Sequence, residues 1–119
     1  MEKARAKLTA AEALLKIGQY DDAVSRAYYA AYHSASACLL TEGQKAETHR
    51  GVLTLFSLLF VKSGKIEKAF GRCLSNLKDD RETGDYEVFS TIDVETAKNA
   101  LQEARDFVAA VDRYLATLS

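Results

Sequence analysis

Residues 20–40 read YDDAVSRAYYAAYHSASACLL, and this stretch decides the fold. It contains neither proline nor glycine, and its first aspartates suit the N-terminus of a helix. We therefore expect one long helix that begins near Asp21 or Asp22 and ends before Gly43. Small residues recur along it at helical spacing and would let another helix approach closely: Ala23, Ala27, Ala30, Ser34, Ala37 and Cys38.

Helical periodicity continues on both sides of this stretch. We expect four further helices, at about residues 2–17, 48–62, 66–80 and 94–118, the last with Asp93 as its N-cap. The run VLTLFSLLFV at residues 52–61 is apolar on almost every face, which predicts the central helix of the fold. The stretch RETGDYEVFSTI, residues 81–92, lacks helical periodicity and is expected to be an irregular connection.

Composition predicts an all-α protein with one domain, residues 1–119. The chain has no proline and only six glycines, which favours long helices, and the short connections indicate an up-and-down bundle of four to five helices. The net charge of −1, from 16 basic and 17 acidic side chains, excludes a generally basic surface that coats DNA. No signal peptide or membrane span is apparent, so we expect a soluble, cytoplasmic protein with reduced cysteines.

Arg26 and His33 are candidate catalytic residues. They are seven residues apart, so their side chains leave nearly the same helix face, with Tyr29 between them. Cleavage of RNA without a metal needs a base for the 2′-hydroxyl proton and a cation for the phosphate, roles that suit histidine and arginine. The structural alternative is that Arg26 pairs with a carboxylate such as Asp85 while His33 forms a hydrogen bond inside the bundle.

Further candidates lie at the start of the third helix and among the tyrosines. His49 and Arg50 could bind a phosphate together with Lys45, although a solvated helix start explains the same residues. The tyrosines at positions 28, 29 and 32 could stack on bases, or they could form core or a dimer interface. No cofactor or metal is expected, because the histidines and cysteines lack any close ligand pair.

The segments SRAYYAAYHSA, HRGVLTLF and RETGDYE, followed by a long final helix, give the chain a resemblance to the HEPN domain family. In particular, it resembles the small stand-alone HEPN proteins of archaea and bacteria. This resemblance implies a bundle of four or five helices that is commonly a homodimer. It also implies a minimal nucleotidyltransferase as partner in a toxin and antitoxin pair. Many members are metal-independent ribonucleases with an arginine followed, after four to six residues, by a histidine.

That motif can be matched at two places. Arg26 and His33 fit its spacing, although they come early in the chain. The stretch from Arg81 has the later position but offers Asp85 and Tyr86 where a histidine is expected. The resemblance therefore leaves two readings open: a toxin-like protein that acts on or binds RNA or a nucleotide, and a catalytically inactive nucleotide-binding or structural helical dimer.

Overall fold

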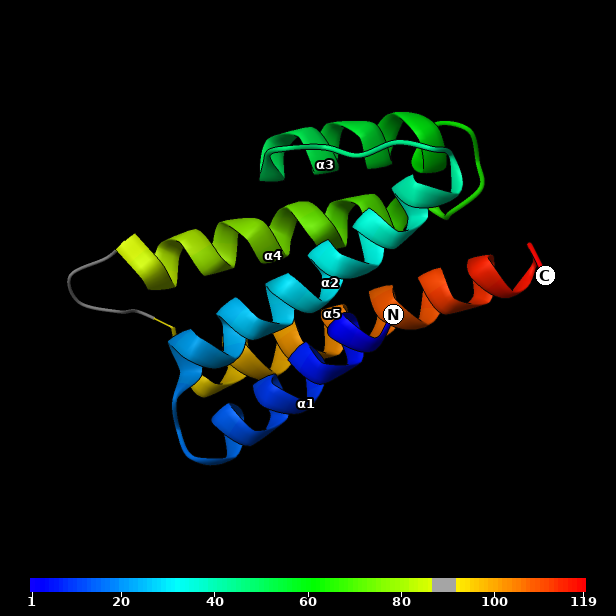
Figure 1. Cartoon of the computed structure of the whole chain (residues 1–119). Helices are drawn as coiled ribbons and strands as arrows, with labels where there is room; N and C mark the ends of the chain where they lie inside the picture. Colours follow the sequence, from blue (N-terminus) through cyan, green and yellow to red (C-terminus); the bar gives the residue numbers. More distant parts are fainter. Residues whose placement is uncertain (87–91) are drawn as a thin grey trace.

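Helix α2 (Tyr20–Thr41) is the central element of the protein. The structure, a computed structural model, describes residues 1–86 and 92–119, and the side chains of 83–86 also lie outside the described residues. Figure 1 shows α2 between the other helices, and it contacts α1, α3, α4 and α5. Its small-residue stripe is buried except at Ala37, as the spacing predicts.

Helices α1 (Glu2–Lys16) and α5 (Val94–Ala116) pack against this small-residue face of α2. Ala30 of α2 is buried in one cluster with Ala4 of α1 and Val108 of α5, so the three backbones approach closely where the side chains are small. The Asp93 side chain caps α5 by accepting a hydrogen bond from the Thr96 amide at 2.8 Å.

The predicted third helix is divided into two elements. Helix α3 (His49–Phe56) continues as a π-helix, η1 (Ser57–Val61), in which the Lys62 amide donates to the Ser57 carbonyl at 2.9 Å. The prediction that this segment is central was wrong: it buries only Val52, Phe56 and Phe60 and lies on the outside of the bundle in Figure 1. Its remaining apolar side chains are partly covered or exposed.

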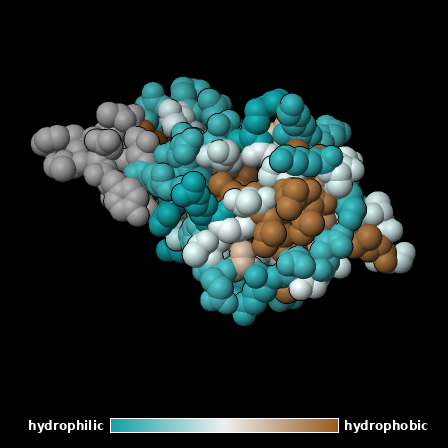
Figure 2. Space-filling view, turned by 90° about the horizontal axis from the view of Figure 1, so that it is seen from above, coloured by the Kyte–Doolittle hydropathy of each residue, from teal (hydrophilic) through white to brown (hydrophobic). Residues whose placement is uncertain are grey.

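Figure 2 looks down on this segment and shows where its apolar side chains go. An apolar patch lies over the η1 end, where the Leu58 side chain is 53% exposed. A run that is apolar on every face therefore covers the core with one side and leaves the other at the surface.

Helix α4 (Lys68–Tyr86) is longer than predicted. The expectation that residue 81 begins an irregular connection was wrong, because residues 81–86 continue the helix. This last part of α4 is polar and lacks an apolar stripe, but an ion pair between Lys78 and Glu82 bridges adjacent turns and supports helix without burial.

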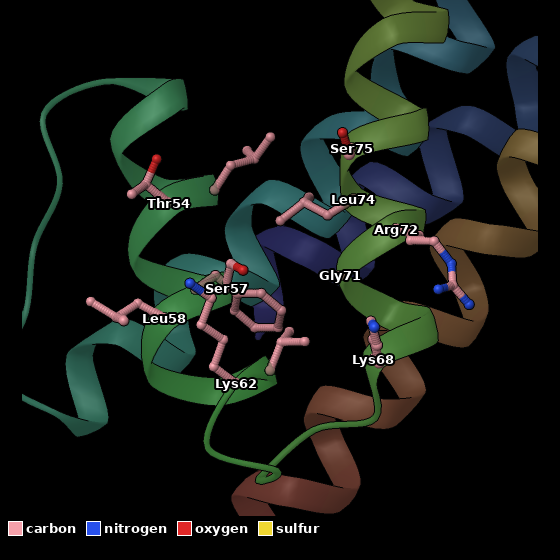
Figure 3. Close-up of a pocket in the computed structure, with 12 residues that line it drawn as sticks. Thr54, Ser57, Leu58, Lys62, Lys68, Gly71, Arg72, Leu74 and Ser75 are labelled. Carbon is pink, nitrogen blue, oxygen red and sulfur yellow. The ribbon is translucent and has the colours of Figure 1, made fainter.

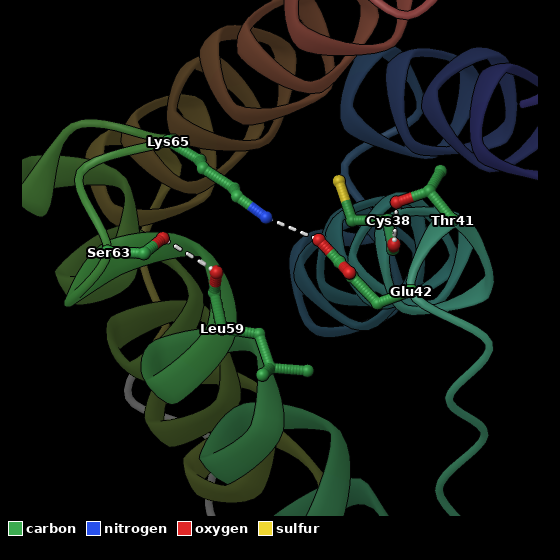
Figure 4. Close-up of polar contacts among 6 residues, drawn as sticks. All are labelled: Cys38, Thr41, Glu42, Leu59, Ser63 and Lys65. Atoms are coloured by element: carbon green, nitrogen blue, oxygen red, sulfur yellow. Dashed lines mark hydrogen bonds and ion pairs between the residues drawn. The ribbon is translucent and has the colours of Figure 1, made fainter.

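Between α2 and α3 the chain reverses through a turn and then runs back without regular secondary structure. Gly43 has φ +67°, a left-handed conformation that favours glycine, and the Gln44 amide donates to the Leu39 carbonyl at 2.9 Å. Residues 42–48 then run back alongside α3 (Figure 1). Figure 4 shows the Lys65 ammonium reaching from the turn before α4 to the Glu42 carboxylate at the end of α2, which ties these two ends together.

All regular structure in residues 1–86 and 92–119 is helical, which confirms the all-α prediction. In Figure 1, α1 and α2 run in opposite directions, as do α3 and α4 and then α4 and α5, so sequential helices are mostly antiparallel. No helix in the described part of the chain is long and apolar enough to cross a membrane.

Candidate functional site

A cluster of aromatic, histidine and arginine side chains joins α2, α3 and α4. We call it the histidine cluster. The members from α2 lie on two adjacent turns, and α3 and α4 each add one side chain. The histidine cluster consists of Tyr28, Tyr29, Tyr32, His33, His49 and Arg81.

His49 is held by two tyrosines. The Tyr28 hydroxyl lies 2.8 Å from His49 Nδ1, and the Tyr32 and His49 rings stack with their centroids 4.5 Å apart. Tyr28 is fully buried, and burial raises the pKa of its hydroxyl. A neutral phenol is a better donor than an imidazole N–H and a poorer acceptor than an imidazole nitrogen, so we assign the proton to Tyr28 and leave His49 with an Nε2–H group.

His33 lies beside the rings of Tyr29 and Tyr32. Its centroid is 5.6 Å from that of Tyr32 and 6.3 Å from that of Tyr29, and it makes no hydrogen bond to another described residue. Burial, then the ammonium groups of Lys3 and Lys7, then His49 lower the pKa of His33. The imidazole is therefore kept neutral and able to accept a proton.

Arg81 covers the rings from α4. Its guanidinium carbon lies 5.2 Å from the Tyr29 ring centroid and 5.7 Å from that of Tyr28, which is cation–π distance. Burial, followed by the charges of Arg81 and Lys78, lowers the pKa of His49. Both histidines are thus neutral for the same reasons: partial burial and positive neighbours.

Positive charge surrounds the histidine cluster from two sides. Lys3 and Lys7 approach from α1, whereas Lys78 and Arg81 approach from α4. Glu82 lies on the same side of α4 and forms the ion pair with Lys78. In a chain with a net charge of −1, this local excess of cations over an aromatic surface favours an anionic, flat-ringed ligand.

The structure brings some of the sequence candidates together and separates others. His33, His49, Tyr29 and Arg81 meet in the histidine cluster, whereas the Arg26 side chain is exposed and forms no hydrogen bond or ion pair with the described residues.

Arg50 and Lys45 are also exposed, which fits the solvated reading of the helix start, and Thr48 caps α3 by accepting from the Gly51 amide at 2.9 Å. Asp85 and Tyr86 belong to the last turn of α4, but their side chains lie outside the described residues, so an Arg26–Asp85 pair stays a prediction.

Sequence reasoning did not identify Lys3 and Lys7 as members of the surroundings of this site. They are four residues apart on α1 and therefore share one helix face, but only the packing of α1 on α2 directs that face toward His33. Their spacing alone is common on solvated helices, so the sequence carried no distinguishing signal.

A cavity of about 540 Å³ lies away from the histidine cluster. Its walls are the end of α3, η1 and the first half of α4. Figure 3 shows Ser57 and Leu74 facing this space and Arg72 pointing away toward α5. Members of the histidine cluster do not line it. Among the side chains that the structure describes, those of residues 1–82 and 92–119, no group of three or more His, Cys, Asp or Glu could hold a metal ion.

In a comparison with known protein families, residues 1–114 match the HEPN domain family. The chain is 38% identical over 115 residues to a Methanocaldococcus jannaschii protein named "Putative toxin MJ0605", covering 97% of this chain and 85% of that protein. It is 35% identical over 116 residues to a "UPF0332 protein" of Thermotoga maritima, covering 98% and 88%. A second M. jannaschii protein, "Putative toxin MJ0142", is 32% identical over 115 residues, covering 97% and 78%.

Proposed function

This chain belongs to the HEPN domain family, and we propose that it is the toxin-like member of a toxin–antitoxin pair, acting on RNA through the histidine cluster. The observation that carries the proposal is the meeting of two neutral histidines on a tyrosine surface ringed by cations from α1 and α4. Two relatives whose printed names read "Putative toxin", similar over 97% of this chain, support the toxin-like role.

The roles follow from the geometry. His33 is the general base, because it is neutral and has no hydrogen-bond partner among the described residues. It takes the proton of a ribose 2′-hydroxyl, whose oxygen bonds to phosphorus while the bond to the 5′-oxygen breaks. The proton held by His33 then returns to the departing 5′-oxygen, and the products are a cyclic phosphate and a 5′-hydroxyl end.

Two further groups stabilise the phosphate during this step. The Arg81 guanidinium supplies positive charge and paired N–H donors, which suits two phosphate oxygens. The Nε2–H group of His49 donates to the phosphate, because Tyr28 already occupies Nδ1. Arg81 thereby takes the role that the sequence assigned to Arg26.

An RNA cleavage assay in the presence of a metal chelator tests this proposal. Labelled single-stranded RNA should be cut by the purified protein, and His33→Ala and Arg81→Ala should each lower the rate by 10²-fold or more, the typical effect of removing such groups. Arg113→Ala, which removes an exposed arginine on α5, is the matched control. Uncut RNA, or cutting that survives His33→Ala, would refute the catalytic roles.

A second reading, an inactive module that binds RNA or a nucleotide, is favoured by one observation. The later arginine motif carries Asp85 and Tyr86 where the family's ribonuclease motif has histidine. Binding of RNA by wild type that is lost in Arg81→Ala, without cleavage, would support this module over the enzyme.

Two partners complete the proposal. A nucleotidyltransferase partner is supported by the family membership, and co-purification with the product of a neighbouring nucleotidyltransferase gene tests it. A homodimer is supported by the apolar patch over η1 in Figure 2, since an exposed leucine surface of this kind favours association. Sedimentation should give the dimer mass well above about 1 μM, and Leu58→Asp should shift it to the monomer.

A further inference from the structure

A second cavity shares a wall with the histidine cluster. It measures about 360 Å³ and lies between the second half of α2 and the chain that returns toward α3. Its lining residues are Tyr32, Ser36, Leu39, Leu40, Gln44, Lys45 and Ala46. Tyr32 belongs to both sites, because the ring that lines this cavity also stacks on His49 with centroids 4.5 Å apart.

The turn at the end of α2 determines the shape of this cavity. The left-handed Gly43 reverses the chain, and the hydrogen bond from the Gln44 amide to the Leu39 carbonyl fixes the first residue of the return path. Ala46 then packs against the core, which anchors the far side of the cavity. The cavity is therefore bounded at one edge by the backbone turn at Gly43 and Gln44 and at the other by the packed side chain of Ala46.

The lining chemistry matches one kind of ligand. Tyr32, Leu39 and Ala46 provide aromatic and apolar walls, the Ser36 hydroxyl and Gln44 amide both donate and accept hydrogen bonds, and Lys45 adds a cation. No lining residue is a carboxylate. A flat heterocycle with a hydrogen-bonding edge and an anion beside it fits these walls, and the volume suits a small ligand.

We propose that this cavity seats the base of one unpaired nucleotide of RNA, beside the phosphodiester held by the histidine cluster. The inference rests on the proposed function and adds the substrate class. A base that enters the cavity must leave its stack, which single-stranded RNA allows at little cost and a duplex resists. The base would lie on Tyr32 in the manner of aromatic platforms in single-strand binding proteins.

The experiment compares three RNA probes of one sequence: a single strand, a blunt duplex, and a single strand that lacks the base at the tested position. Wild type should bind the plain single strand about tenfold more tightly than either of the others, the size of one base–aromatic stack. Equal binding of the plain and abasic strands would overturn the base site while leaving the proposed function intact. No binding to any strand would overturn both.

A variant that fills the cavity sharpens the test. Ala46→Phe should reduce single-strand binding to the abasic level, whereas Ala13→Phe, which adds the same ring at an exposed position of α1, should not. Gln44→Leu, an exposed position that carries no packing burden, provides a second variant should Ala46→Phe fold poorly. A 2-aminopurine at the tested position should be quenched by stacking in wild type and in Ala13→Phe, and unquenched in the filled variant; quenching in all three would refute the site.

Discussion

Helix α4 presents two faces of opposite charge, and the contrast between them explains where an anion can bind. Lys78 and Arg81 lie near His49 of α3, and Arg81 also covers tyrosines of α2, whereas Asp79 and Asp80 line a cleft toward α5 together with Glu103. Partial burial shifts pKa values on both faces. On the first face it keeps histidines neutral beside cations, and on the second it sets carboxylates against one another.

On the acidic face, the environment disfavours the charged form of the carboxylates. Burial and then Asp79 raise the pKa of Asp80, and burial, then Asp80 and Asp106, raise that of Glu103. One carboxylate oxygen of Glu103, Oε2, is buried without a hydrogen-bond partner within the described part of the chain. This face therefore costs stability at neutral pH, whereas in the histidine cluster His49 shares a hydrogen bond with the buried Tyr28 hydroxyl.

The largest expected effect is on the free energy of unfolding, and it tests whether packing of Tyr28 supports the histidine cluster. Tyr28→Ala should destabilise the protein by about 3–5 kcal/mol, because it removes a fully buried ring that supports His49. Tyr28→Phe keeps the ring and loses only the hydroxyl, so it should cost about 1 kcal/mol. Urea unfolding measures both, and equal costs for the two variants would contradict the packing role.

The pH dependence of stability should differ between the two faces. The folded-state pKa values of His33 and His49 are lowered, so below about pH 6.5 the unfolded chain binds more protons and folding stability falls as the pH falls. Thermal unfolding from pH 7 to pH 5 should show this loss, and the double variant His33→Gln, His49→Gln should reduce it. A double variant that loses as much stability as wild type between pH 7 and pH 5 would contradict the pKa directions of the two histidines.

The acidic face should respond with the opposite sign. A raised folded-state pKa means that the charged carboxylate opposes folding above its unfolded value, so Glu103→Gln should stabilise the protein at pH 7. We expect about 1 kcal/mol, or roughly 4 °C in melting temperature for a chain of this size. Glu47→Gln, at an exposed position, is the control and should have little effect; a loss of stability in Glu103→Gln would show that its charge is paired.

The smallest effect concerns the arginine that lies apart from both faces. Arg26→Ala should change stability by less than about 1 kcal/mol, because the side chain is exposed. A cost near 3 kcal/mol would instead indicate a buried pair, the alternative in which Asp85 is its partner. Denaturant unfolding at pH 7 distinguishes the two values.

How far the sequence predicts this molecule depends on what each pattern measures. The alanine stripe of α2 and the Asp93 cap of α5 depend on local spacing, and both were predictable. The central position of α2 was not predictable, because the run VLTLFSLLFV is more apolar than α2. Only the tertiary packing shows that this run buries one side and leaves the other at the surface. The meeting of His49 with His33 was missed for the same reason, since they come from different helices.

The π-helix at Ser57–Val61 has a consequence for how this chain tolerates insertions and deletions. A π-helix holds one more residue per turn than the hydrogen-bonding pattern of an α-helix requires, so η1 is equivalent to a single inserted residue that the fold has accommodated. Deleting one residue within η1 would therefore remove the bulge and restore a continuous α-helix, with the residues on either side kept in register. In α3, which is a regular α-helix, the same deletion would rotate His49 by about 100° relative to Phe60, which is buried and stacks on Phe56 at 5.6 Å. The register of η1 is fixed by the buried ring of Phe60 and by the close approach of Gly71 to Val61, so a lost residue is tolerated only at the bulge itself.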